Sequence, residues 1–205
     1  MRIISGQARG RKLFTPGQSK EIRPTSDRSR EALFNIIGQK IVGARVLDLY
    51  SGTGAFGLEA LSRGAKDVVF VDLHQRAIEL TRRNLDMCMP SIDFTEAVIP
   101  RIIKYDLRRG IPELPVSDTT QQTQFDFTFL DPPYGKGLAE KTLQDIDASQ
   151  LCAKNALIIA EEVSTAMLPD SFPTQLTLSD QRRYGVTKFW FYTTQNRGEC
   201  CTAAS

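Results

Sequence analysis

The sequence has 205 residues, of which 41% are hydrophobic, and a formal net charge of +2. This length can bury one sizeable core but hardly two full domains. No apolar stretch approaches the roughly 18 residues of a membrane span, and the N-terminus lacks the apolar core of a signal peptide. The four cysteines have no C-x-x-C spacing and a single histidine accompanies them, which argues against zinc and disulfides and favours a soluble protein of the reducing cytoplasm.

The first thirty residues are basic: eight Lys or Arg stand against two acids, a local balance of +6 that leaves −4 for the rest. Residues 3–13 predict a short, glycine-punctuated β-hairpin. A patch of one sign attracts polyanions such as nucleic acid, although a solvated surface has the same composition. We expect residues 1–24 to form a small basic RNA-binding extension, and residues 1–20 to be removable without loss of the fold or of cofactor binding.

Helix and strand patterns alternate after this extension. A helix is predicted at about 27–38, capped by Thr25 or Ser26, with Ala32, Leu33, Ile36 and Ile37 on one face. The predicted strands are 45–50, 67–72, about 100–106, 125–131 and 155–163, and the helices that join them are 54–64, 74–88 and about 137–147. This alternation is typical of a parallel sheet with crossover helices.

The end of the chain has a different pattern. Two β-rich segments, 175–178 and 186–192, are split by Tyr184-Gly185 and predict a closing antiparallel hairpin. Residues 117–124 are predicted to be a surface loop and residues 196–205 a disordered tail. The expected fold is therefore α/β and Rossmann-like, with a mostly parallel seven-stranded sheet in a domain of residues 25–195.

A glycine loop follows the first predicted strand. Gly52-x-Gly54-x-x-Gly57 matches the dinucleotide-binding fingerprint, and Asp72 ends the next strand as a ribose-binding acid would, so a nicotinamide- or flavin-dependent oxidoreductase is one hypothesis. Asp48, four residues before the first glycine, suits a cationic ligand better than a pyrophosphate. S-adenosylmethionine carries a sulfonium and an ammonium, and Asp72 could accept from both hydroxyls of its ribose. A tight strand-to-helix turn alone would explain the glycines but not the two acids.

A second motif, Asp131-Pro132-Pro133-Tyr134, follows the fourth predicted strand. The two prolines fix φ, remove two amide donors and leave carbonyl groups free to accept, and an aromatic ring comes directly after them. An exocyclic amine on a flat base needs such acceptors for its N–H groups and a ring against the base plane. The alternative is a Pro-Pro turn that ends a strand and exposes a tyrosine.

These residues carry a resemblance to known families. Residues 48–57 resemble motif I of class I methyltransferases, and residues 131–134 resemble the (D/N/S)PP(Y/F) motif of enzymes that methylate planar amino groups. Residues 2–13, 23–35 and 57–64 are further similar to the bacterial 16S rRNA guanine-N2 methyltransferase family that modifies guanine 966, and this similarity extends to about Thr194. Tyr50 in place of a commoner Phe, the 117–124 loop and the cysteine-containing tail are departures that leave both motifs intact.

The resemblance implies roles for individual residues. The catalytic set would be Asp131, Pro132, Pro133 and Tyr134, with Asp131 and the Pro132 carbonyl holding the guanine N2 and Tyr134 stacking on the base. The S-adenosylmethionine set would be Asp48, Tyr50, Ser51, Gly52, Thr53, Gly54, Asp72, Leu73 and Asp106, where Asp106 could equally be a helix N-cap. The RNA-binding candidates are Arg2, Arg9, Arg11, Lys12, Arg28 and Arg30, with a solvated surface as the alternative. Glu59, Glu161 and Glu162 are expected to be structural or surface acids, and no metal is required.

The sequence therefore predicts a methyltransferase that transfers a methyl group from S-adenosylmethionine to the N2 amine of a guanine in 16S rRNA. The protein is expected to be monomeric and cytoplasmic, and its substrate to be either naked rRNA or a 30S assembly intermediate. Two alternatives stay open. A DNA amino-methyltransferase acting on adenine N6 or cytosine N4 would share the second motif, and a nicotinamide-dependent oxidoreductase would share the glycine loop.

Overall fold

The computed structural model describes residues 1–15, 27–93, 100–114 and 124–195. The predicted cap at Thr25 or Ser26, the tail at 196–205 and nearly all of the 117–124 loop lie outside these residues. Within the described ranges, no helix combines the length and the apolar character needed to cross a membrane.

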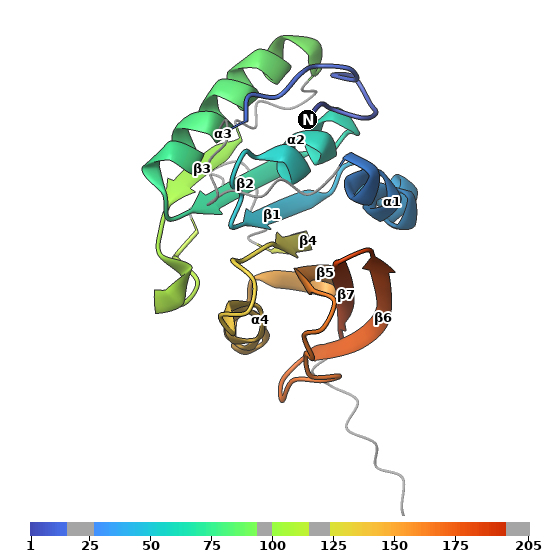
Figure 1. The fold of residues 1–205 in the computed structure, drawn as a ribbon, viewed down its shortest axis with the longest axis vertical. Coiled ribbons are helices and arrows are strands. Elements are labelled where there is room, and N and C mark those ends of the chain that lie inside the picture. The colour runs from blue at the N-terminus through green and yellow to red at the C-terminus, as the bar shows by residue number, and fades with distance from the viewer. Residues whose placement is uncertain (16–26, 94–99, 115–123, 196–205) are drawn as a thin grey trace, which may run out of the picture.

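The core of the protein is a seven-stranded sheet with the order β3-β2-β1-β4-β5-β7-β6 (Figure 1). Its strands are β1 (Arg45–Leu49), β2 (Asp67–Asp72), β3 (Arg101–Lys104), β4 (Phe125–Leu130), β5 (Cys152–Val163), β6 (Leu176–Tyr184) and β7 (Thr187–Thr194). β1 pairs in parallel with β2 and β4, and the parallel pattern continues to β3 and β5. β7 runs antiparallel to both β5 and β6. The predicted mixed sheet with a closing antiparallel hairpin is confirmed.

Helices cover both faces of this sheet, because the central strands are apolar on both sides. α1 (Asp27–Ile37), α2 (Ala55–Ser62) and α3 (Gln75–Cys88) pack on the face that presents Val46, Val68 and Phe129. α4 (Leu138–Ala148) packs on the opposite face with Leu47. β1 and β2 are buried along their whole length, as expected for parallel strands covered on both faces. Three short 3-10 turns, η1 (Gly38–Ile41), η2 (Met89–Ser91) and η3 (Leu107–Arg109), complete the described elements.

The first thirteen residues form an antiparallel turn that packs against α2. The turn has one bridge, Arg2 to Lys12, and the amide of Ile3 donates to the Arg11 carbonyl at 2.9 Å. Ile3 and Ala8 are each 1% exposed and belong to the same apolar core as α1 and α2. We call residues 1–13 the N-terminal arm.

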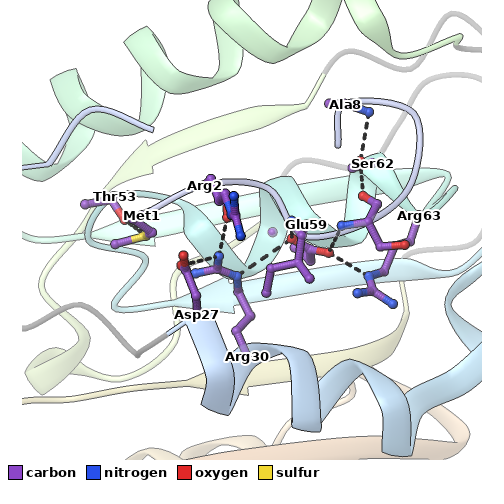
Figure 2. Close-up of polar contacts among 12 residues, drawn as sticks. Met1, Arg2, Ala8, Asp27, Arg30, Thr53, Glu59, Ser62 and Arg63 are labelled. Carbon is purple, nitrogen blue, oxygen red and sulfur yellow. Dashed lines mark hydrogen bonds and ion pairs between the residues drawn. The ribbon is translucent and has the colours of Figure 1, made fainter. Parts of the chain in front are cut away.

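Two polar side chains of α2 hold this arm (Figure 2). The Glu59 carboxylate accepts from the amides of Ile4 at 2.7 Å and Ser5 at 3.0 Å, and the Ser62 hydroxyl accepts from the Ala8 amide at 2.9 Å. Glu59 is 0% exposed. The expectation that residues 1–20 can be removed without affecting the fold conflicts with this packing, because removal would expose core side chains and leave a buried carboxylate without its amide donors.

Candidate active site

One cavity of about 500 Å³ opens at the carboxyl ends of β1, β2 and β4. This is the edge of a parallel α/β sheet at which ligands bind as a rule. The cavity has three walls: the glycine loop with the strand-end acids, the Asp131–Tyr134 loop, and a patch that α1 and the N-terminal arm contribute. The predicted residues on its wall are Asp48, Tyr50, Ser51, Gly52, Thr53, Asp72, Leu73, Asp106, Asp131, Pro132, Pro133 and Tyr134.

The glycine loop is held by Asp72 at the end of β2. One carboxylate oxygen of Asp72 accepts from the Gly52 amide at 2.9 Å, and the other accepts from the His74 amide at 2.8 Å. Gly54, the N-cap residue of α2, has φ 74°, a left-handed conformation that favours glycine. A Cβ on Gly57 would lie 2.3 Å from the Phe70 ring. The third glycine therefore serves the packing of α2 on β2 rather than a ligand.

Asp48 is a buried carboxylate beneath the loop. It is 1% exposed and accepts from the Gly57 amide at 3.0 Å. Burial raises the pKa of Asp48 well above its usual value; the Gly57 hydrogen bond offsets part of this rise, and the nearby charge of Asp72 adds to it. The ionised carboxylate is therefore poorly stabilised until a cation lies beside it.

We expect Asp48→Asn to raise the melting temperature of the ligand-free protein while weakening its affinity for S-adenosylhomocysteine. Because folding raises the pKa of Asp48, the contribution of this residue to stability falls as pH rises from the unfolded pKa to the folded pKa, so near neutral pH Asp48 costs stability. Asparagine keeps an oxygen for the Gly57 amide and removes that cost. The rise in melting temperature should be about 2–4 °C for each kcal/mol by which the substitution stabilises the folded protein, and it should become smaller as pH is lowered. Thermal unfolding at several pH values measures it. A melting temperature that falls in the variant at pH 7 would contradict the account.

Asp106 and Tyr50 also line the cavity. Asp106 caps η3 by accepting from the Arg108 amide at 3.1 Å, and its carboxylate also pairs with the Arg108 side chain at 2.7 Å. These contacts, the Arg108 side-chain hydrogen bond above all, lower the pKa of Asp106 to about 2. The N-cap alternative for Asp106 is thus realised, on the wall of the same cavity. The Tyr50 hydroxyl lies 2.9 Å from the Thr142 hydroxyl of α4.

The Asp131–Tyr134 loop is anchored to the sheet on both of its sides. The Asp131 amide donates to the Leu49 carbonyl of β1 at 3.4 Å. The Tyr134 hydroxyl donates to Glu161 at 2.7 Å, and the Gly135 amide donates to Glu162 at 3.2 Å. Both glutamates are buried, at 2% and 3% exposed.

Glu161 and Glu162 belong to the site, although the sequence pattern gave no reason to place them there. They are consecutive residues of β5, and they fix the ring of Tyr134 and the backbone after it before any base arrives. Burial raises the pKa of Tyr134, and the carboxylates of Glu161 and Asp131 raise it further, so the hydroxyl stays a proton donor to Glu161. The available signal was a pair of acids that directly follows the apolar run 156–160 of the same strand.

The basic candidates divide into exposed and buried residues. Arg2, Arg9, Arg11, Lys12 and Arg28 are exposed, and Arg11 donates to the Ser91 hydroxyl at 2.6 Å.

Arg30 is instead 1% exposed, and its guanidinium donates to Asp27 and to the Arg2 carbonyl. A side chain in this setting cannot reach an RNA phosphate, so the RNA-binding role expected of it does not fit. The buried face of α1 is Arg30, Leu33, Phe34 and Ile37, with Ile36 42% exposed. Arg30 precedes these apolar residues by three, four and seven positions, which is the spacing of one helix face and could have been recognised.

The cavity fits S-adenosylmethionine in charge and in donor set. Asp48 and Asp72 are acids that suit a cationic group and a ribose, and Phe56 and Phe129 make part of the wall apolar. The buried Ser51 hydroxyl has no hydrogen-bond partner among the described residues, as a group reserved for a ligand would.

Known proteins similar to this chain are methyltransferases. The family model described as conserved hypothetical protein 95 matches residues 1–193. The chain is 33% identical to ribosomal RNA small subunit methyltransferase D of Escherichia coli, over 97% of this chain and 92% of that protein, and 32% identical to the protein of the same name from Haemophilus influenzae, over 94% and 93%. The solved structure of Escherichia coli yhhF superposes with a TM-score of 0.76 at 30% identity, covering 95% of this chain and 98% of that one.

Proposed function

The chain belongs to the family described as conserved hypothetical protein 95, and from that membership we propose that it transfers a methyl group from S-adenosylmethionine to the N2 amine of a guanine in 16S rRNA. The observation that carries the proposal is the position of the Asp131–Tyr134 loop, which faces the same cavity as Asp48 and Asp72. Two relatives that match over nearly their whole length are named ribosomal RNA small subunit methyltransferase D. Neither a nicotinamide enzyme nor a DNA methyltransferase accounts for both facts.

The chain's own residues position the acceptor amine. S-adenosylmethionine, when bound, supplies an electrophilic methyl group on a sulfonium. The Asp131 carboxylate and the Pro132 carbonyl would accept from the two N2 hydrogens, which builds lone-pair density on the nitrogen, and the Tyr134 ring would hold the base plane. An aryl amine needs to lose its proton only late, so Asp131 acts as an acceptor rather than as a strong base. Because Glu161 and Glu162 hold this loop in place, little reorganisation accompanies the reaction.

The test is methyl transfer from labelled S-adenosylmethionine to 16S rRNA, followed by nucleoside analysis. We expect N2-methylguanosine as the product. Naked 16S rRNA and isolated small-subunit particles should be compared, because either could be the substrate. Label in adenine or cytosine, or label in DNA in place of rRNA, would refute the proposal.

We further propose that the protein acts as a monomer in the bacterial cytoplasm.

We expect Asp72→Ala to weaken binding of S-adenosylhomocysteine at least about tenfold. The variant loses a charged acceptor for the ribose hydroxyls, a contact of roughly 1.5–3 kcal/mol, and it also releases the Gly52 amide that Asp72 holds at 2.9 Å. Calorimetry on the folded variant measures the effect. Asp86→Ala, a change on the far part of α3, is the matched control, and equal affinities for the two variants would remove Asp72 from the cofactor site.

We expect the triple substitution of Arg9, Arg11 and Lys12 by Gln to weaken RNA binding. These side chains are exposed on the N-terminal arm, and each phosphate contact contributes about 0.7 to 0.9 to the slope of log affinity against log salt. The slope should fall by roughly two to three units if all three residues contact phosphate. Lys40→Gln with Lys154→Gln is the control, because Lys40 lies at the amino ends of the strands, beside a second cavity. An unchanged slope would mean that the arm does not bind RNA.

A further inference from the structure

Arg30 is a buried residue on the wall of the cavity, and the hydrogen-bonding capacity of its guanidinium is only partly used. It lines the cavity beside Met1, Thr53 and Ala55. Its Nη2 donates to the Arg2 carbonyl and to Asp27, whereas Nε and Nη1 have no hydrogen-bond partner among the residues that the structure describes. Three N–H donors of a side chain that is 1% exposed are therefore unused.

Glu59 does not account for these donors. The Arg30 Nε lies 3.7 Å from the Glu59 carboxylate, an ion-pair distance but not a hydrogen bond. Figure 2 shows that Glu59 faces the arm and Arg63 as well as Arg30. Its oxygens already accept from two arm amides and from the Arg63 Nε at 2.7 Å. A buried charged donor without an acceptor is costly and rare, so a ligand is the natural partner for Arg30.

The surroundings of Arg30 favour an anion. Ala55 and Phe56, the first two residues of α2, line the same cavity as Arg30. The Gly57 amide of this first turn donates to Asp48, but the N-cap residue Gly54 offers no side chain to the amides before it, which lie at the positive end of the helix dipole. The acids Asp48 and Asp72 line the same cavity. The cavity therefore offers anionic groups and cationic groups to the same ligand, and among the cationic ones Arg30 is buried.

We propose that Arg30 binds the α-carboxylate of the methionine part of S-adenosylmethionine. The methionine part carries an ammonium and a carboxylate on one carbon. Its site therefore needs an anionic side chain for the ammonium and a cationic side chain for the carboxylate. Asp48 serves the ammonium, and Arg30 with the first turn of α2 serves the carboxylate through charge-assisted hydrogen bonds. The inference rests on the cofactor of the proposed function and is independent of the RNA substrate.

The test compares two ligands within each protein variant. S-adenosyl-3-thiopropylamine keeps the ammonium of S-adenosylhomocysteine but lacks its carboxylate. In the wild type, calorimetry should show that it binds about tenfold or more weakly than S-adenosylhomocysteine. In Arg30→Gln the two ligands should bind with affinities within about twofold of each other. The quantity to compare is the ratio of the two dissociation constants within each protein. A general disturbance of the site weakens the binding of both ligands and cancels in this ratio. The same ratio in Arg30→Gln as in the wild type would overturn the assignment.

A second measurement does not depend on whether Arg30→Gln folds. A crystal structure of the wild-type protein with S-adenosylhomocysteine should place a carboxylate oxygen within about 3.2 Å of Arg30 Nη1 or Nε. A carboxylate bound elsewhere would overturn the inference and leave the proposed function intact. Failure of the wild type to bind S-adenosylhomocysteine at all would instead remove the cofactor assignment itself.

Discussion

Asp131→Asn is expected to lower the rate of methyl transfer about 10²-fold or more while the affinity for S-adenosylhomocysteine changes little. Asparagine has nearly the same shape, but it presents an amide donor where the carboxylate presents a second acceptor. A donor directed at the guanine N2 hydrogens opposes the lone-pair density that the transition state requires, so the loss falls on turnover rather than on cofactor binding.

The measurement is single-turnover methyl transfer to rRNA with calorimetry on the same preparations. Asp145→Asn is a matched control, because Asp145 pairs with Lys141 on α4 at 2.6 Å and does not line the cavity. Its turnover should equal that of the wild type. Near-wild-type turnover in Asp131→Asn would leave the N2 amine without its proposed acceptor.

The sequence was sufficient for the parts of the molecule that repeat a periodic pattern. The helix predicted at 74–88 is α3, Gln75–Cys88, and the strand predicted at 67–72 is β2. β6 was predicted only at 175–178, but it continues to Tyr184. Its second half is polar because it forms an exposed edge of the sheet, and a polar edge strand is hard to distinguish from a loop by composition.

The buried acids could not be assigned from the sequence. Glu59, Glu161 and Glu162 are each almost fully buried. The residue type alone does not show whether a glutamate in a helix or a strand faces water or a cluster of backbone amides. The two arm amides that donate to Glu59 lie 54 and 55 residues away along the chain. Only the tertiary fold brings such groups together, so their roles become visible only in the structure.

The N-terminal arm shows the same limit. Its short apolar pairs and glycines predict a small, removable β-hairpin, but Ile3, Ala8 and Leu13 belong to the same apolar core as α1 and α2. We infer that the arm has two functions. Its exposed basic side chains are offered to RNA, and its buried side chains complete the core beside α1 and α2, while Met1 contributes to the wall of the cavity.

Glu59→Ala is expected to destabilise the protein by about 3–5 kcal/mol. The carboxylate is the shared partner of the Ile4 and Ser5 amides and of Arg63. Alanine would leave these buried donors without an acceptor and would remove the negative charge beside Arg30. For a chain of this length the loss corresponds to a fall in melting temperature of about 6–20 °C.

The same variant decides whether the arm is part of the domain. If Glu59 ties the arm to α2, Glu59→Ala should make the bonds after Arg9 and Arg11 sensitive to trypsin, and deletion of residues 1–13 should cost at least as much stability as the substitution. Glu79→Ala removes an exposed acid of α3 and should change stability by less than about 0.5 kcal/mol. A melting temperature for Glu59→Ala that matches Glu79→Ala would mean that the arm is separable after all, and the buried carboxylate would then have to be satisfied by Arg30 and Arg63 alone.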